Sequence, residues 1–509
     1  MENTYTIKIL PQNLIVQAEE GEDLLAVQIR AGIVPDAPCG GQGTCGKCLV
    51  DILQEDGSAQ SVLACQYPVK QDLVIRVPEK GNTKILETGV RRPVEIAPQV
   101  SEGYGAAFDI GTTTVVCYLL DLETGRQIGR ASMLNPQRQF GADVISRCEH
   151  AIAEGVDELT LAVREALNQL LEEACAEAAI NTDQVRLITV VGNTCMHHLF
   201  LGIDPKPLTV IPYDAAVKDE IVMKAADAGI YAHPETVLQV LPNIAGFVGA
   251  DTVGCMLAVA FDELEDLTLM IDIGTNGEMV MGNRSRMAAC SAAAGPAFEG
   301  GRLACGRRGI SGSIDHVKEE NGKLVCHVIG SEEGQEEALG ICGSGILDAV
   351  SVLLETGRID ECGMIDTDAE EAFELPDSDL PAIRLKDEVY ISQKDIQEVQ
   401  LAKGAIAAGI ELLAEHLEIQ IGDIRKVLLA GAFGNYMDPH SACVIGMIPA
   451  ELEDRIEPIG NAAGEGSVRA TLNEQEFLHA QKLSEQAEFI ELASRPDFQD
   501  VFTDHLMFE

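Results

Sequence analysis

Short apolar runs separated by turn residues fill the first 78 positions of the chain. Alternation of apolar and polar residues predicts strands at 4–10, 13–17, 49–53 and 73–77. Between the second and third of these runs, residues 23–31 carry leucine, valine and isoleucine at helical spacing. The predicted order is therefore strand, strand, helix, a long loop, and two further strands, which is enough for one small mixed domain.

A longer apolar pattern occurs twice in the rest of the chain. Residues 106–120 read as an apolar strand, the turn D-I-G-T-T-T and a second apolar strand, and residues 268–281 repeat this order around D-I-G-T-N-G. Two copies of one pattern indicate duplicated lobes. We therefore expect a first domain at 1–78, a linker at 79–103, and a two-lobed domain at 104–509 whose lobes cover about 104–260 and 261–509.

Both turns carry groups that suit phosphate oxygens. Glycine permits a sharp turn, and backbone N–H groups, threonine hydroxyls and an asparagine amide can then point at an anion. A carboxylate at the start of each turn, Asp109 and Asp272, can hold Mg²⁺ through water. The candidate phosphate-binding residues are Gly111, Thr112, Thr113, Thr114, Gly274, Thr275, Asn276 and Gly277.

A third turn follows the apolar run that begins at Val427. The sequence V-L-L-A-G-A-F-G-N-Y places small residues where a strand ends, so that backbone can approach an adenine or a ribose closely. We expect Gly431, Ala432 and Phe433 near a nucleoside. Glycine turns also precede helices at 291–301 and 340–348, where they could bind an anion or let helices pack closely.

Four cysteines are grouped in the loop of the first domain and just after it. They are Cys39, Cys45, Cys48 and Cys65, with four glycines between the first three. Thiolates so close together favour a metal centre, and a [2Fe–2S] cluster or a Zn(Cys)₄ site would use this number of ligands. A zinc site of this kind usually uses two C-x₂-C pairs. Only Cys45 and Cys48 have that spacing here, so we predict a [2Fe–2S] cluster rather than zinc.

Composition narrows the class of protein. The chain has 509 residues, 46% of them hydrophobic, and a formal net charge of −46. Such a charge repels the phosphate backbone and excludes a nucleic-acid binder. No run of about 18 apolar residues predicts a membrane span, and we expect a cytoplasmic protein with no membrane partner.

Two pairs of polar residues have more than one interpretation. Arg91 and Arg92 lie in the predicted linker, where we favour a solvated pair over docking on a domain. His197 and His198 follow Asn193 and Thr194 in V-V-G-N-T-C-M-H-H-L, where packing is favoured, followed by helix capping or partner contact by Asn193 and Thr194, and last a metal site.

The three turns, in this order, resemble those of the ATPase superfamily of actin, sugar kinases and heat-shock chaperones. The resemblance implies a cleft between two RNase H-like lobes, with ATP and Mg²⁺ bound near Asp109 and Asp272. In that superfamily a polar residue on the helix before the second phosphate turn orients the attacking water. Asp251, in N-I-A-G-F-V-G-A-D-T, is our candidate, and the alternative is an N-cap for a helix beginning at Thr252.

The first domain resembles the β-grasp ferredoxins, including the x₅ spacing of the adrenodoxin kind. Together with L-P-N-I-A-G-F-V-G-A-D, D-I-G-T-N-G-E-M and D-F-Q-D-V-F, it makes the chain resemble the ATP-dependent reductive activators of corrinoid proteins. The fold expected is a β-grasp ferredoxin-like domain followed by a duplicated, RNase H-like, actin-type ATPase domain, a combination of α+β and α/β.

This resemblance implies an activity and partners. Such activators reduce cobalt(II) to cobalt(I) in the corrinoid protein of a methyltransferase system, so the partners would be that protein and an upstream low-potential electron donor; a homodimer remains open. Two departures are a segment before the first phosphate turn that is shorter than the middle domain of longer relatives, and no C-terminal cysteine cluster. The alternatives are a small-molecule kinase with a ferredoxin module and an activator of another low-potential enzyme.

Overall fold

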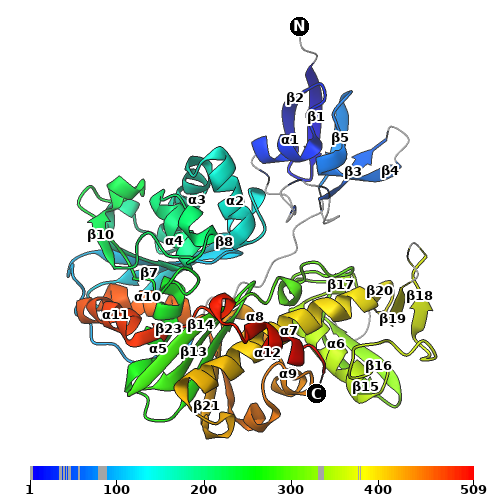
Figure 1. The fold of residues 1–509 in the computed structure, drawn as a ribbon. Helices are drawn as coiled ribbons and strands as arrows, with labels where there is room; N and C mark the ends of the chain where they lie inside the picture. Colours follow the sequence, from blue (N-terminus) through cyan, green and yellow to red (C-terminus); the bar gives the residue numbers. More distant parts are fainter. Residues whose placement is uncertain are drawn as a thin grey trace.

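The computed structural model describes residues 4–31, 33, 37, 41, 43, 48–54, 58–77, 89–330, 337–376, 378 and 380–508. Figure 1 shows a small N-terminal sheet and a larger part that contains two six-stranded sheets and most of the helices. Cys48 and Cys65 lie within the described residues, whereas Cys39 and Cys45 lie outside them.

The N-terminal part is a five-stranded sheet covered by one helix. Ile7, Ile9 and Ile75 face that helix and are fully buried. Strands β1 and β5 pair in parallel in the order β2-β1-β5-β3-β4, and β4 is a strand that the sequence pattern did not predict. The elements are β1 (Thr4–Leu10), β2 (Leu14–Glu19), α1 (Leu24–Arg30), β3 (Leu49–Leu53), β4 (Ala59–Leu63) and β5 (Leu73–Arg76).

The first large sheet is built around the first repeat. Strands β6 and β7 form an antiparallel hairpin, β8 pairs antiparallel with β7, and β9 pairs in parallel with β6, in the order β10-β11-β9-β6-β7-β8. Helices α2, α3 and α4 bury its apolar face. The elements are β6 (Tyr104–Ile110), β7 (Thr114–Asp121), β8 (Gln127–Leu134), α2 (Val144–Glu154), α3 (Asp157–Glu177), β9 (Val185–Gly192), α4 (Thr194–Leu201), β10 (Ile221–Lys224) and β11 (Val237–Val240).

The second large sheet repeats this pairing around the second turn. Strands β12 and β13 form the hairpin, β14 pairs antiparallel with β13, and β21 pairs in parallel with β12, in the order β22-β21-β12-β13-β14-β23. Because both sheets share one pairing pattern, the repeat in the sequence corresponds to a repeat of topology. The strands are β12 (Thr268–Ile273), β13 (Gly277–Asn283), β14 (Arg286–Ala292), β21 (Lys426–Ala430), β22 (Ile456–Gly460) and β23 (Ala487–Phe489).

Two helices pack against each other between the large sheets. Helix α5 (Ala250–Val259) follows β11, and α10 (Ala462–Leu472) occupies the equivalent place after β22. Glycines make the contact close, because a Cβ on Gly466 would lie 2.1 Å from the carbonyl oxygen of Gly254. The first residues of both helices reach the same cleft, which is described below.

Smaller elements complete the second lobe. Two three-stranded sheets are ordered β16-β15-β17 and β18-β19-β20. No helix in the described part of the chain has the length and apolar character needed to cross a bilayer. These elements are β15 (Ser313–Glu320), β16 (Lys323–Val328), β17 (Gly340–Ile341), α6 (Gly343–Glu355), β18 (Ala372–Glu374), β19 (Pro381–Lys386), β20 (Val389–Ser392), α7 (Gln393–Leu417), α8 (Gly431–Tyr436), α9 (Pro439–Val444), α11 (Glu474–Gln486) and α12 (Phe498–Asp504).

The segment at 89–97 is docked on the larger part, against helices α5 and α10. The Arg91 guanidinium lies 3.0 Å from the carboxylate of Glu465, and Arg92 donates to the carbonyl of Leu257. Arg469 on α10 donates in turn to the carbonyl of Arg92. The expectation of a solvated arginine pair is therefore wrong for Arg92, whereas Arg91 stays 57% exposed while it contacts Glu465. The segment contacts both α5 and α10.

Candidate functional site

The two phosphate turns and the third turn meet at one cleft of about 420 Å³. The turn at 111–114 connects β6 to β7, and the turn at 274–276 connects β12 to β13. Gly431, Ala432 and Phe433, at the start of α8, line the same cleft. The structure thus brings together three segments that the sequence singled out separately.

The first turn is held from several sides. The N–H of Gly111 donates to the carbonyl of Thr114 at 2.9 Å, and a Cβ on Gly111 would lie 2.8 Å from that oxygen. Asn193 donates from Nδ2 to the Thr112 hydroxyl, and the buried Arg147 donates to the Thr112 carbonyl. These contacts fix the backbone of the turn and leave Thr113 and Thr114 lining the cleft.

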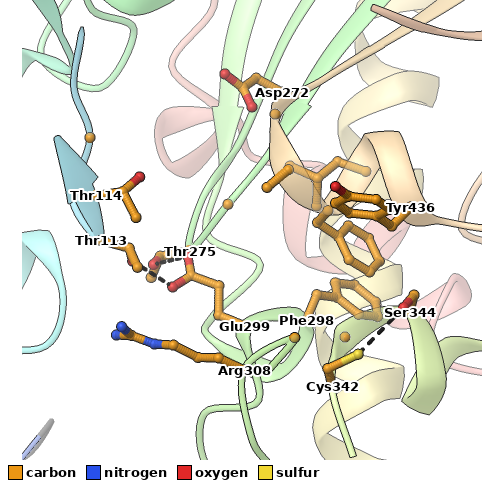
Figure 2. Close-up of a pocket in the computed structure, with 18 of the residues that line it drawn as sticks. Thr113, Thr114, Asp272, Thr275, Phe298, Glu299, Arg308, Cys342, Ser344 and Tyr436 are labelled. Carbon is orange, nitrogen blue, oxygen red and sulfur yellow. Dashed lines mark hydrogen bonds between the residues drawn. The ribbon is translucent and has the colours of Figure 1, made fainter. Parts of the chain in front are cut away.

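A carboxylate that the sequence analysis did not single out joins the two turns. Thr113 donates its hydroxyl to Oε2 of Glu299 at 2.9 Å, and Thr275 donates to Oε1 at 2.8 Å. Figure 2 shows Glu299 reaching between the two threonines. Glu299 ends a short 3₁₀ turn after β14, within the glycine-rich stretch 291–301. That stretch was noted for its glycines, and its glutamate gave no separate signal.

Besides Glu299 and Asp315, three aspartates and one glutamate line the cleft. Asp109 and Asp272 begin the two turns, Asp251 lies in the first turn of α5, and Glu278 pairs with Asp272 across the β12–β13 ladder. Burial raises the pKa of Asp109 and of Asp272 to about 6. Burial, reinforced by Asp272, raises the pKa of Asp251 to about 7, and burial also raises the pKa of Glu278. So much negative charge in one cleft favours a bound cation.

The spacing of these acidic side chains indicates how a cation could bind in the cleft. Among the residues that the structure describes, no group of three or more His, Cys, Asp or Glu side chains is spaced to hold a metal ion. Mg²⁺ usually keeps several waters and binds through one or two carboxylates together with substrate phosphates. The cleft offers enough carboxylates for that mode of binding.

Asp251 is not the N-cap of its helix. Helix α5 begins at Ala250 with Gly249 as its N-cap, and Oδ1 of Asp251 accepts the N–H of Thr252 at 2.7 Å. The capping alternative is therefore wrong. At the equivalent helix α10 the N-cap is Asn461, whose Nδ2 donates to Oδ2 of Asp109 at 2.9 Å. Asn461 was missed, although N-A-A-G after a strand echoes the N-I-A-G before Asp251.

The third turn is shaped by a left-handed glycine and two aromatic rings. Gly431 has a φ of 80°, and a Cβ there would lie 2.5 Å from Oδ1 of Asp272. The ring of Phe433 stacks on Phe298, with centroids 4.8 Å apart and planes inclined by 16°. Tyr436 lies beside this stack in Figure 2. The flat apolar wall suits a nucleobase, and Phe298 is a third residue, after Glu299 and Asn461, that the sequence analysis did not single out.

The described cysteines of the N-terminal domain lie side by side. The Sγ atoms of Cys48 and Cys65 are 3.3 Å apart, well beyond the length of about 2.05 Å of a disulfide. Cys48 precedes β3 and Cys65 follows β4, so the sheet brings them together. Two soft thiolates at this separation fit adjacent ligands of one iron. Cys39 and Cys45, the other two predicted ligands, lie outside the described residues.

The residues after β9 have structural partners. Asn193 caps α4 by accepting the N–H of Met196, and Thr194 donates to the carbonyl of Ala245. His198 contacts the carbonyl of Thr194 and accepts the N–H of Ala216. Both nitrogens of the buried His197 lack a hydrogen-bond partner among the described residues, and burial lowers its pKa to about 3. Asn193 thus caps a helix and also touches the first phosphate turn.

Comparison with known families covers nearly the whole chain. A model of the 2Fe-2S iron-sulfur cluster binding domain matches residues 7–70, one of the RACo middle region matches 104–264, and one of the C-terminal domain of RACo, the ASKHA domain, matches 266–509. The match to the middle region begins at residue 104 and therefore includes the first turn at 111–114. The predicted combination of a ferredoxin-like domain with an actin-type ATPase domain is confirmed.

Individual relatives agree with these matches. The corrinoid activation enzyme RamQ of Eubacterium limosum is 34% identical over 94% of both chains. The methylated-amine-specific Co(II) corrinoid protein reductase of Methanosarcina barkeri is 26% identical over 71% of this chain and 68% of its own. The solved structure of a reductive activator for a corrinoid, iron-sulfur protein matches with a TM-score of 0.71 and 27% identity, covering 99% of this chain and 98% of that one. The chain belongs to the RACo family of corrinoid activators.

Proposed function

We propose that this protein uses ATP to drive the one-electron reduction of cobalt(II) to cobalt(I) in a corrinoid protein. The observation that carries the proposal is the presence, on one chain, of a ferredoxin-like sheet that pairs Cys48 with Cys65 and a cleft that joins two phosphate turns. The names of its relatives support the choice of a corrinoid protein as the acceptor.

The cysteines would hold the electron carrier. Cys39, Cys45, Cys48 and Cys65 would ligate a [2Fe–2S] cluster, which supplies single electrons when bound. The protein's own contribution is to place two of these thiolates next to each other at the ends of β3 and β4. An external low-potential donor would supply each electron, and the cobalt would accept it.

The cleft would bind ATP with Mg²⁺. Asp109 and Asp272 would face the metal, the two turns would bind phosphate oxygens, and the wall at Gly431 and Phe433 would face the nucleoside. Asp251 would orient the attacking water, because it lies beside Asp272 at the start of α5. Hydrolysis breaks the bond between the γ-phosphorus and its bridging oxygen and forms a bond from phosphorus to the water oxygen.

The energetic role of ATP follows from the size of one electron step. A tenfold change in an equilibrium corresponds to about 59 mV for one electron. A nucleotide that favours one conformation of the complex by a hundredfold to a thousandfold would therefore shift the cobalt or cluster couple by about 120 to 180 mV. Closure of the cleft on ATP is the event that would select this conformation.

Anaerobic reduction of a corrinoid protein tests the proposal. A cobalt(II) corrinoid protein, a chemical reductant, this chain and Mg-ATP should together give cobalt(I), followed by its absorption. Leaving out ATP should stop the reaction, and so should Cys48→Ser, since electron supply and conformational drive belong to different domains. Equal rate and extent of reduction without ATP would disprove the coupling, and phosphorylation of a small molecule without reductant would indicate a kinase.

A further inference from the structure

Glu299 occupies donors that a bound nucleotide would need. Its carboxylate accepts one hydroxyl from each lobe, Thr113 at 2.9 Å and Thr275 at 2.8 Å. A hydroxyl has one hydrogen to donate. While both hydrogens point at Glu299, neither threonine can donate to a phosphate oxygen.

Glu299 also has the shape and charge of the group it would meet. A carboxylate presents two negative oxygens to the two hydroxyls, as the end of a phosphoryl group would. Two anions cannot share these donors, because like charges at such short range repel each other. A phosphoryl group that binds between the turns must therefore take the place of Glu299.

The phosphoryl group that would displace Glu299 can be identified from the positions of the aromatic wall and of the threonines in the cleft. Figure 2 shows the aromatic wall of Phe298 and Tyr436 on one side and Thr113, with Glu299, on the other. A nucleotide whose base lies at the aromatic wall extends its terminal phosphate toward the threonines. ADP, which is one phosphoryl group shorter, would leave the contacts of Glu299 in place.

We propose that Glu299 makes the site distinguish ATP from ADP. In the nucleotide-free and ADP-bound protein it holds the two phosphate turns together, and the γ-phosphate of ATP displaces it from Thr113 and Thr275. This inference rests on the proposed function, since it requires the turns to bind ATP. The proposal goes beyond that function by giving a role to Glu299, which lies outside both repeated turns. Because of Glu299, the contact between the lobes would break only when a nucleotide with a γ-phosphate binds.

Affinities for two nucleotides test the proposal on the full-length protein. Calorimetry with Mg²⁺ would measure the Kd of ADP and of the non-hydrolysable analogue AMPPNP for wild type, Glu299→Gln and Glu299→Asp. The amide of Gln cannot accept a hydrogen bond from the second threonine, and Asp keeps the charge but is too short to span both hydroxyls. Both variants should bind AMPPNP about tenfold more tightly, as expected for removing one charge-assisted hydrogen bond, and should bind ADP within about twofold of wild type.

A matched control separates the contact from the charge. Asp315 lines the same cleft but pairs with His327 and touches neither threonine. Asp315→Asn should change the affinities for AMPPNP and ADP by one common factor. The proposal is wrong if Glu299→Gln also shifts both nucleotides equally, or if it weakens AMPPNP selectively, which would make Glu299 a ligand of the nucleotide. If the wild-type protein binds neither nucleotide, the proposed function itself is wrong.

Discussion

Replacing Asp251 by asparagine should make the nucleotide-free protein more stable and less active. Asp251 lies near Asp272 and Asp109, and its pKa is raised to about 7 from the ordinary 3.8. The folded protein therefore holds a carboxylate in surroundings that disfavour its charge. Asparagine keeps an oxygen that can accept the N–H of Thr252 and removes the charge.

The size and sign of the effect follow from these two pKa values. Between pH 3.8 and about 7 the unfolded chain releases a proton that the folded chain retains, so the contribution of Asp251 to stability becomes more unfavourable as the pH rises and is constant above about 7. At about 1.4 kcal/mol per pKa unit, the full displacement is worth about 4 kcal/mol. Because Asp251 opens on the cleft, where solvent screens it, we expect a gain in the variant of about 2 kcal/mol at pH 8 and about 1 kcal/mol at pH 5.5.

Urea unfolding at the two pH values would measure this gain, followed by circular dichroism because the chain has no tryptophan. Asp266→Asn is the matched control, since Asp266 is exposed before β12 and should give no gain at either pH. ATP hydrolysis by Asp251→Asn should fall at least tenfold. Equal or lower stability of the variant at pH 8, or a gain independent of pH, would refute the reasoning about the buried charge.

Three further changes test other parts of the molecule. Asp272→Asn should abolish ATP hydrolysis, measured by phosphate release, and leave the visible absorption of the iron–sulfur cluster intact; retained turnover would mean that the second turn is not the phosphate site. Cys48→Ser should remove that absorption from anaerobically prepared protein without changing nucleotide affinity, and stoichiometric zinc with no sulfide in the wild type would contradict the cluster. His197→Leu should raise the free energy of unfolding at pH 7 by about 1 kcal/mol, because it removes two buried nitrogens without partners. Since the pKa of His197 falls from 6.5 to about 3 on folding, the wild type should also lose stability relative to this variant as the pH falls below 6.5. A stability difference between the two proteins that does not change with pH would contradict this account of His197.

The repeated hairpins could be predicted because their signal is local. Each turn needs a glycine between apolar strands, and the carboxylates Asp109 and Asp272 stand at fixed positions before it. The same holds for Gly431, whose left-handed backbone brings it against Asp272. Apolar periodicity likewise gave four of the five N-terminal strands, whereas β4 was missed because its residues are mostly exposed.

Other site residues depend on contacts between distant segments. Glu299 and Thr113 are far apart in the sequence, and nothing in the local pattern of either predicts their hydrogen bond. Asn461 reaches Asp109 because α10 packs against α5 and against β6, the strand that carries Asp109. Arg91 and Arg92 looked solvated because their partners lie on α10 and α5, which the sequence could not place beside them.

The contacts of residues 89–97 determine at which residue a shortened protein that contains only the ATPase part should begin. A fragment that begins at residue 104, where the family match begins, would lose the guanidinium of Arg91 and leave Glu465, which is 6% exposed beneath that segment, without this cation. Asn473 would also lose the carbonyl of Glu95. Because the Arg91 side chain is itself 57% exposed and the deletion also uncovers Glu465, losing the pair of Arg91 and Glu465 costs about 1 kcal/mol rather than the penalty of a fully buried pair. A fragment beginning at or before residue 89 keeps these contacts, so we expect it to be more stable than one beginning at residue 104.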